Sequence, residues 1–278
     1  MTRPPTERVV EAAPAKINLA LHVTGQRSDG YHLLDSLVAF ADIADKVTVA
    51  AADRPSFAVT GPMADGVPVD ASNLVLRAAE WFAPGVPVAI TLDKHLPAAA
   101  GIGGGSSDAA ATLRALARLT GRAVPAGVAV LGADVPVCMD PLAQRMEGVG
   151  EVLTRLAPLP PAHLVLVNPR VHTPTPAVFK ALAQKHNSPL PPIPAFADAQ
   201  ALIGWLRGTR NDLQAPAIAG APVIAAVLAA LECAPVARMS GSGATCFALF
   251  DSAPPAAALA ARLRRADPDW WVFDARLC

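Results

Sequence analysis

The chain has 278 residues, 23 Lys and Arg against 23 Asp and Glu, 53% hydrophobic residues and 17% charged residues. This length suits one large domain or two medium ones, and the apolar fraction excludes a disordered chain. Because the balance is neutral and the basic residues are scattered, there is no basic stripe and we expect no nucleic-acid partner.

The sequence gives no sign of a membrane or an oxidising compartment. The charge-free stretch 213–231 is mostly alanine and contains Pro216 and Pro222, so we expect a buried helix from Pro222 onward and no membrane span. The opening MTRPPTERVVEAAPAK has no apolar signal core. The cysteines lack C-x-x-C spacing, which predicts unbridged thiols in a cytoplasmic protein; they are Cys138, Cys233, Cys246 and Cys278.

In chain order, the first half alternates strand-like and helix-like patterns. Residues 17–23 alternate with a period of two, which predicts a strand followed by a hairpin connection at 25–30. The other elements predicted here are strands at 46–51 and 86–92 and helices at 73–82 and 108–119.

A proline-rich stretch, Pro158 to Pro161, marks the expected boundary between an N-terminal lobe (1–158) and a C-terminal lobe (159–278). Beyond it we predict a strand at 163–167, a proline-rich loop at 188–194, helices at 199–207 and 222–232, a strand–turn–strand at 239–250, a helix at 255–265 and a strand at 270–273. Strands mixed with helices, without regular βαβ repeats, favour an α+β fold of two lobes.

The glycine-rich segment LPAAAGIGGGSSDAAA, residues 96–111, is the strongest local signal. Its four glycines let the backbone approach a ligand, and Ser106 or Ser107 is suited to cap the helix that follows. Free N–H groups at a helix start attract anions, so the segment fits a phosphate chain. The alternative is a tight turn without a ligand.

Two familiar phosphate loops do not match this segment. The P-loop is excluded because no lysine follows the glycines. The dinucleotide fingerprint almost fits from Gly101, but Ser106 stands where its last glycine belongs and no acidic residue follows at the required distance. A nicotinamide-dependent oxidoreductase is therefore disfavoured.

Two charged residues stand out in apolar surroundings. Lys16 and Asn18 share one face of the first predicted strand. Asp134, in LGADVPVCMD, is flanked by apolar residues, and a buried carboxylate needs a cationic partner. From the residues alone, Lys16 is a solvated strand end or a charge donor, and Asp134 is a structural ion-pair member or a catalytic base.

Taken together, the motifs resemble the family of 4-diphosphocytidyl-2-C-methyl-D-erythritol kinases, within the galactokinase–homoserine kinase–mevalonate kinase–phosphomevalonate kinase (GHMP) superfamily. The motifs occur in this order: PAKINL, GYH, LPAAAGIGGGSSDAA, GADVPVC, EGVGE, PTPAVF, NDL and MSGSGATC. The glycine segment alone indicates the superfamily, and PAKINL with GYH and GADVPVC narrows it to this family.

The resemblance implies a two-lobed GHMP kinase fold, with an N-terminal lobe like ribosomal protein S5 domain 2 and a ferredoxin-like C-terminal lobe that completes the substrate cleft. It implies transfer of the γ-phosphate of ATP, with Mg²⁺, to the 2-hydroxyl of a cytidine diphosphate-linked polyol on the non-mevalonate isoprenoid route. We expect a monomer or a weak homodimer.

The resemblance also assigns residues. Asp134 matches the catalytic aspartate that accepts or orients the hydroxyl proton, and Lys16 matches the catalytic lysine that pairs with it. The positions that match the ATP site are Pro97, Ala98, Ala99, Ala100, Gly101, Ile102, Gly103, Gly104, Gly105, Ser106 and Ser107, with Asn73 and Lys94 near the adenosine. The positions that match the substrate site are Asn18, the cytosine-recognising pair Tyr31 and His32, and Thr175 with the aromatic wall Phe179.

Three positions depart from some family members. Asp108 stands where others carry asparagine, and a carboxylate beside phosphates is repulsive unless Mg²⁺ or Lys16 intervenes. Ala99 and Ala100 replace glycines. We see no carboxylate cluster that would hold a metal by itself, so ATP oxygens and a loop serine are the expected ligands.

Two other functions are alternatives to this assignment. Another kinase of the superfamily would share the glycine segment but not GYH with PTPAVF. A non-catalytic nucleotide sensor would lack Lys16 or Asp134, and both are present.

Overall fold

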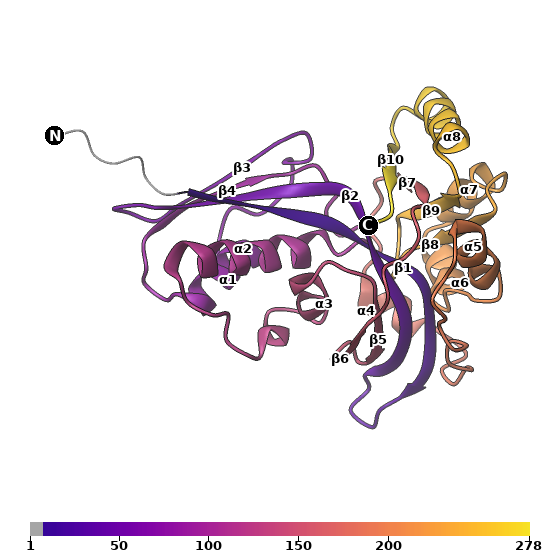
Figure 1. The fold of residues 1–278 in the computed structure, drawn as a ribbon, viewed down its shortest axis with the longest axis horizontal. Coiled ribbons are helices and arrows are strands. Elements are labelled where there is room, and N and C mark those ends of the chain that lie inside the picture. Colours follow the sequence, from indigo (N-terminus) through magenta and orange to yellow (C-terminus); the bar gives the residue numbers. More distant parts are fainter. Residues whose placement is uncertain (1–7) are drawn as a thin grey trace. The chain divides into compact units, whose positions relative to one another are not determined.

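The computed structural model describes residues 8–278, which divide into two compact units. Unit 1 comprises the described residues up to Ala15, Ile43–Ala98 and Gly103–Asp140. Unit 2 comprises Lys16–Asp42, Ala99–Ile102 and Pro141–Cys278. Strands β1 (Arg8–Gln26) and β2 (His32–Ala51) pair with each other, and each contributes residues to both units (Figure 1). The predicted lobe boundary at residue 158 stays a prediction.

Unit 1 is a sheet with helices on one face. Strand β4 (Val88–Asp93) runs antiparallel to the end of β2 and parallel to β3 (Ser56–Thr60). Helices α1 (Leu74–Phe82) and α2 (Gly104–Thr120) cover one face of these strands (Figure 1), followed by a short turn η1 (Val128–Val130) and helix α3 (Val135–Met139). Both predicted helices of this region and the strand at 86–92 are confirmed.

The two long helices of unit 1 begin for different reasons. Asn73 caps α1, because its side-chain oxygen accepts a hydrogen bond from the Val75 N–H at 2.9 Å. Helix α2 begins at Gly104 rather than at residue 108, and its N-cap is Gly103 with φ 63°. The predicted serine cap is therefore wrong: glycine tolerates this left-handed conformation, and the Ser107 hydroxyl instead donates to the Pro14 carbonyl at 2.7 Å.

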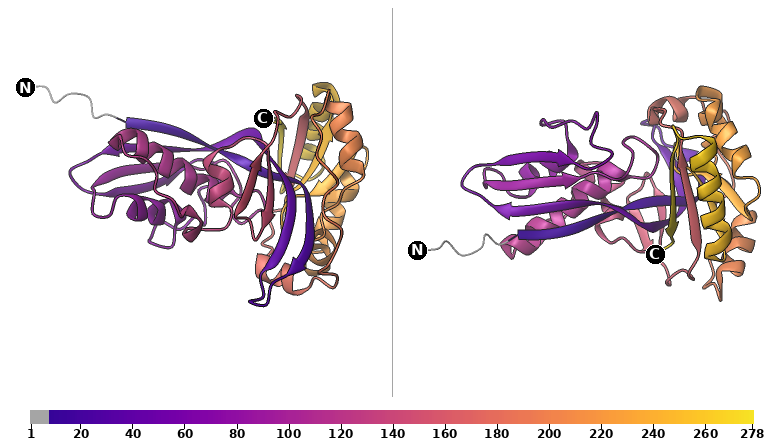
Figure 2. Two further views of the ribbon diagram at one scale, coloured as in Figure 1. Left: turned by 60° about the horizontal axis from the view of Figure 1, so that its bottom comes forward. Right: turned by 90° about the horizontal axis from the view of Figure 1, so that it is seen from above.

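Unit 2 contains a four-stranded antiparallel sheet with the order β10-β7-β9-β8. Its strands are β7 (His163–Asn168), β8 (Val236–Met239), β9 (Cys246–Phe250) and β10 (Trp271–Arg276). Helices α5 (Ala199–Arg207), α7 (Val223–Ala230) and α8 (Ala253–Ala266) lie along this sheet (Figure 2). These elements confirm the predictions for the second half of the chain. Unpredicted elements are α4 (Thr175–Lys180), α6 (Gln214–Gly220), β5 (Gln144–Gly148) and β6 (Val152–Arg155).

The strand predicted at 46–51 is only the end of the 20-residue strand β2. The first part of β2 pairs with β5 in unit 2. There the buried Asp35 accepts two hydrogen bonds from Arg145 (2.8 and 2.7 Å) and one from the Leu190 N–H (2.8 Å). Such buried polar residues interrupt the apolar alternation, so the pattern does not show the strand.

The charge-free stretch 213–231 forms two short helices, α6 and α7, separated near Pro222. Within residues 8–278, no helix is both long enough and apolar enough to cross a membrane. The four cysteines carry free thiols: Cys138 and Cys246 are buried, Cys233 and Cys278 exposed.

Candidate active site

Lys16 and Asn18 lie on one face of β1 in unit 2, and both are buried (3% and 1% exposed). The Lys16 ammonium donates a hydrogen bond to Asn18 Oδ1 at 3.0 Å. Asn18 Nδ2 donates in turn to Ser36 Oγ (2.8 Å), which donates to the Ala20 carbonyl (2.6 Å). Asn18 is therefore held from the neighbouring strand and fixes the direction of the Lys16 side chain.

The tip of the glycine segment, Ala99–Ile102, belongs to the same unit. The Lys16 N–H donates to the Ile102 carbonyl at 2.9 Å, so the tip is anchored directly on β1. Gly101 has φ 74°, and a Cβ there would lie 2.6 Å from the carbonyl oxygens of Ser240 and Gly243. Only glycine fits this close approach.

Ala99 and Ala100, which replace glycines of the family pattern, differ in how well an alanine suits the position. Ala99 adopts φ 49°, the left-handed region that glycine favours, whereas the buried Ala100 accepts a hydrogen bond from the Thr245 N–H at 3.1 Å. A non-glycine residue in this region costs about 1 kcal/mol. The surrounding contacts hold the tip in this shape despite the missing glycine.

The flanks of the glycine segment lie in unit 1. Pro97 and Gly104 are buried, and the N–H groups of the first turn of α2 begin directly after Gly103. Ser106 is half-buried, with its Oγ 3.9 Å from the position of a Cβ on Gly132. The start of a helix with free N–H groups favours an anion. Binding of a phosphate chain by this segment stays a prediction.

Asp134 occupies the N-cap position of α3 in unit 1 and is half-buried. Its carbonyl accepts a hydrogen bond from the Cys138 N–H at 3.3 Å, and Pro136 stands in the first turn of the helix. A proline there fits a helix start, because the N–H that it lacks would have no partner within the helix. The turn thus fixes the backbone of Asp134. Its pairing with Lys16 stays a prediction.

Lys94 and Asn73 have structural partners of their own in unit 1. The Lys94 ammonium lies between the carboxylates of Asp45 and Asp108, with 3.0 Å to Asp108, and all three side chains are buried. Asp45 also accepts from the N–H of Leu96 at 2.8 Å, at the entry to the glycine segment. A Cβ on Gly104 would lie 3.3 Å from Lys94 Nζ, so the ammonium sits against the start of α2. Contact of Lys94 or Asn73 with adenosine stays a prediction.

The structure identifies the cation that lies beside Asp108. We expected Mg²⁺ or Lys16, but the partner is Lys94, 14 residues upstream, directly after strand β4 and before the glycine segment. Among residues 8–278, Asp108 Oδ1 is buried without a hydrogen-bond partner. Burial raises the pKa of Asp108 to about 8, Lys94 opposes this rise, and the charge of Asp45 adds to it.

Asp108→Asn is expected to flatten the pH dependence of stability. The folded chain keeps the Asp108 proton up to about pH 8, whereas an unfolded aspartic acid releases it near pH 3.8. Folded protein therefore binds the extra proton across this window, and the free energy of unfolding falls as the pH rises through it. Urea unfolding at pH 5 to 9 measures the slope. An unchanged slope in Asp108→Asn would show that another group titrates.

The residues assigned to cytosine recognition lie in unit 2, and the structure brings two of them together. The rings of His32 and Phe179 stack, with centroids 4.8 Å apart and planes 25° apart. Tyr31, the preceding residue, is 64% exposed. Thr175 lies one turn before Phe179 on α4, and its hydroxyl is 2.7 Å from that of Ser242.

The His32 side chain has the protonation state that hydrogen bonding to a neutral heterocycle requires. Burial, and the nearby Lys185 cation, lower the pKa of its imidazole, so the ring is neutral at pH 7. Within the described part of the chain, its Nε2 is buried without a hydrogen-bond partner. A neutral imidazole offers one donor and one acceptor, which suits the edge of a nucleobase.

Several residues of this region were not assigned from the sequence. Ser240 and Ser242 lie in the MSGSGATC motif, which contributed to the family resemblance without a role for single residues. Asn211, in the NDL motif, contacts the same segment. The two motifs contributed to the family resemblance, but their spacing does not predict a contact between segments so far apart in the chain.

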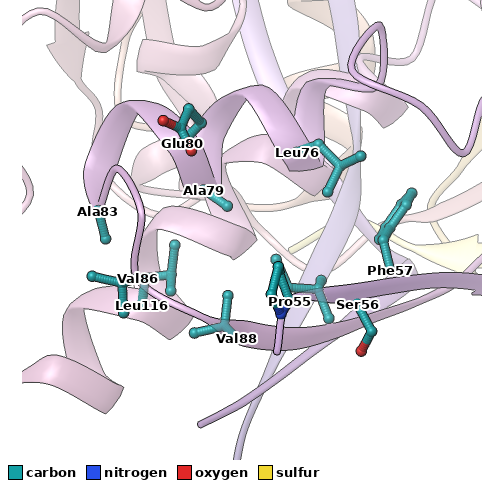
Figure 3. Close-up of a pocket in the computed structure, with 11 residues that line it drawn as sticks. Pro55, Ser56, Phe57, Leu76, Ala79, Glu80, Ala83, Val86, Val88 and Leu116 are labelled. Atoms are coloured by element: carbon teal, nitrogen blue, oxygen red, sulfur yellow. The ribbon is translucent and has the colours of Figure 1, made fainter. Parts of the chain in front are cut away.

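A cavity of about 250 Å³ lies elsewhere in unit 1, between α1 and strands β3 and β4 (Figure 3). Its walls are mainly apolar, with Glu80 as the charged residue among those that line it. None of its lining residues is a predicted site residue. In the part of the chain that the structure describes, no group of three or more His, Cys, Asp or Glu is arranged to hold a metal.

Two family models match the chain: "GHMP kinases N terminal domain" over residues 73–141 and "GHMP kinases C terminal" over residues 193–269. A 4-diphosphocytidyl-2-C-methyl-D-erythritol kinase from Cereibacter sphaeroides is 58% identical over 272 residues, covering 95% of this chain and 98% of that protein. The enzyme of the same name from Dinoroseobacter shibae is 55% identical, with 97% of each chain covered.

Solved structures agree with these matches. A crystal structure of 4-(cytidine 5'-diphospho)-2C-methyl-D-erythritol kinase superposes with a TM-score of 0.79 at 33% identity, covering 97% of this chain and 99% of the other. Homoserine kinase from Cytophaga hutchinsonii shares the fold, with a TM-score of 0.64 at 17% identity over 99% of this chain and 96% of the other. The α+β prediction is confirmed, and the chain belongs to the 4-diphosphocytidyl-2-C-methyl-D-erythritol kinase family of the GHMP kinases.

Proposed function

We propose that the chain transfers the γ-phosphate of ATP to the 2-hydroxyl of 4-diphosphocytidyl-2-C-methyl-D-erythritol, on the non-mevalonate route to isoprenoid precursors. Family membership makes the chain a small-molecule kinase with ATP as co-substrate. The observation that carries the substrate assignment is the stacked pair of His32 and Phe179 next to the exposed Tyr31 ring. A cytosine is the part of this substrate that homoserine and mevalonate lack.

Phosphoryl transfer needs alignment and charge neutralisation more than covalent chemistry. Asp134, on its fixed turn before α3, accepts or orients the proton of the attacking hydroxyl. Lys16 supplies positive charge near the hydroxyl and the γ-phosphate, and its direction is set by Asn18 at 3.0 Å. A buried, directed ammonium needs little reorganisation as charge develops.

The glycine segment binds the triphosphate in this proposal. Its tip is anchored to β1 and to the MSGSGATC motif, while its flank opens into the first turn of α2. Free N–H groups and the helix dipole then meet the phosphate charge without a local cluster of basic residues. The neutral net charge of the chain is compatible with strongly anionic substrates for this reason.

Mg²⁺ fits the donor set of the flank. This ion prefers oxygen ligands, retains water and is held in nucleotide sites by one or two side chains together with phosphates. We propose Ser106 as its protein ligand. Ser106 lies in the first turn of α2, is half-buried, and has its hydroxyl near Gly132. When bound, the ion neutralises phosphate charge.

In this proposal the aromatic residues form the cytosine pocket. The base stacks with the aromatic rings of Tyr31 and Phe179, and the free Nε2 of His32 bonds its polar edge. Stacking on an aromatic ring contributes about 1–3 kcal/mol per base. Thr175, whose hydroxyl lies 2.7 Å from that of Ser242, is the further side chain that we propose to contact this substrate.

Tyr31→Ala is expected to raise the KM for the cytidyl substrate by about 5- to 150-fold, which is the stacking energy expressed as a ratio. The KM for ATP and the melting temperature should stay near wild type, because the ring is 64% exposed. Steady-state kinetics with each substrate varied in turn measure both constants. Tyr31→Phe, which keeps the ring, is the control. A larger rise in the KM for ATP would reverse the proposed ends of the site.

Competing substrates test the assignment as a whole. Purified chain is given ATP with the cytidyl substrate, with homoserine or with mevalonate, and phosphorylated product is measured. We expect efficient turnover of the cytidyl substrate alone. Comparable turnover of homoserine or mevalonate would contradict the proposal, and ATP binding without any turnover would favour a nucleotide sensor.

We further propose that the enzyme works in the cytoplasm as a monomer or weak homodimer, without a nucleic-acid or membrane partner. The neutral charge balance and the free thiols support this setting. Sedimentation of the purified chain over a range of concentrations measures its oligomeric state.

A further inference from the structure

The NDL motif, residues 211–213, connects β1 to the MSGSGATC motif within unit 2. The Leu21 N–H donates to the Arg210 carbonyl, and the Asp212 N–H donates to the Leu21 carbonyl, both at 2.9 Å. Asp212 also accepts from the Val23 N–H at 2.7 Å. The backbone of Asn211 is therefore fixed on the strand that carries Lys16 and Asn18.

Asn211 is buried (7% exposed), and both polar atoms of its side chain make hydrogen bonds. Its Nδ2 donates to the carbonyls of Met239 (2.7 Å) and Gly241 (2.8 Å), and its Oδ1 accepts from the Leu213 N–H (2.9 Å). The two carbonyls stand on either side of Ser240. The Asn211 side-chain amide thus holds the backbone on both sides of Ser240 and fixes its conformation.

Ser240 makes the link that depends on this backbone. Its hydroxyl accepts from the Asn18 N–H at 3.0 Å and donates to the Gly101 carbonyl at 3.0 Å. It therefore joins the strand of the proposed catalytic lysine to the tip of the proposed phosphate loop. The fit is close on both sides, because a Cβ on Gly241 would lie 2.8 Å from the Gly101 carbonyl oxygen.

We propose that Asn211 is a positioning residue for phosphoryl transfer: by holding the carbonyls of Met239 and Gly241, it orients Ser240, which fixes the tip of the ATP phosphate loop against β1. The proposal rests on the assignment of Ala99–Ile102 to the ATP site. Asn211 touches neither substrate in this arrangement. Its effect passes through Ser240 to Gly101, at the ATP end.

Asn211→Asp tests the proposal, because it keeps the shape but replaces the two N–H donors by a carboxylate oxygen facing two carbonyls. We expect kcat/KM for ATP to fall at least about tenfold, while the KM for the cytidyl substrate stays within about twofold. The Kd of a fluorescent ATP analogue should rise in parallel. A rise in the cytidyl KM equal to that for ATP would overturn the proposal.

Asn187→Ala is the matched control for loss of stability. Its Nδ2 donates to the Val23 carbonyl (3.0 Å) and to Asp212 (3.2 Å), so it supports the same motif without contacting the MSGSGATC motif. We expect a lowered melting temperature with unchanged ATP constants. If this variant weakens ATP as much as Asn211→Asp does, a positioning role is excluded.

A double-mutant cycle covers the case in which Asn211→Asp does not fold. Asn211→Ala and Ser240→Ala each remove one step of the same link, so their effects on kcat/KM for ATP should be strongly non-additive. Additive effects would contradict the proposal. The wild-type chain, assayed with the cytidyl substrate in parallel, separates these outcomes from a failure of the proposed function, which would leave no activity to compare.

Discussion

Asp134→Asn is expected to lower turnover of the cytidyl substrate by at least about 100-fold while ATP binding is retained. Asparagine keeps the size of the side chain and its place before α3 but removes the negative charge and the basic oxygen. In the proposed mechanism the hydroxyl then loses the group that accepts or orients its proton, whereas the N–H groups proposed to hold the triphosphate belong to other residues. Initial rates and the Kd of an ATP analogue measure the two effects separately.

Asp140→Asn provides the control for this experiment. Asp140 is exposed at the end of the same short helix, so the same change there leaves the turn of Asp134 in place. We expect it to keep wild-type turnover. Near-normal turnover in Asp134→Asn would remove Asp134 from the mechanism, and loss of ATP binding would place it among the nucleotide contacts instead.

Lys94→Met is expected to lower the free energy of unfolding by about 3–5 kcal/mol, the usual effect of removing one partner of a buried ion pair. The change leaves Asp45 and Asp108 facing each other without their shared cation, and both are buried. Burial lowers the pKa of the Lys94 ammonium, but the two carboxylates outweigh this and raise it, so the wild-type lysine stays charged. Urea unfolding at pH 7 measures the difference.

Two variants show whether the buried charges are the cause. Lys46→Met makes the same change at an exposed position of β2, and surface substitutions of this kind stay within about 0.5 kcal/mol of wild type. At pH 9, above the pKa of Asp108, Lys94→Met with Asp108→Asn should recover part of the loss, because one carboxylate then remains instead of two. A stable Lys94→Met protein with a raised KM for ATP would instead assign Lys94 to the adenosine.

The elements that the sequence predicted are those with local causes. Helix α1 has its cap at Asn73, and α5 falls at the predicted residues because its amphipathic pattern and the cap at Asp198 are contained within one segment. The two-lobed fold class followed from similar short-range patterns and from the family resemblance.

What the sequence did not show depends on partners far along the chain. Asp35 looks like a surface residue until Arg145 is placed against it, 110 positions later. Asp108 was expected to meet Lys16 or Mg²⁺, and nothing in the spacing points to Lys94 and Asp45 as one buried cluster. The stack of His32 on Phe179 also required the fold, since the two residues lie far apart in the sequence and no local pattern joins them.

The interleaving of the two units limits how this enzyme can be divided. The chain passes from one unit to the other after Ala15, Asp42, Ala98, Ile102 and Asp140. A gene fragment ending at residue 158 would encode all described residues of unit 1 together with two complete segments of unit 2 and only the start of the third, so the apolar strand residues of unit 2 would lack partners. Split reporters and single-cut domain swaps are therefore poor tools for this protein, and exchanges between relatives are better made at single residues.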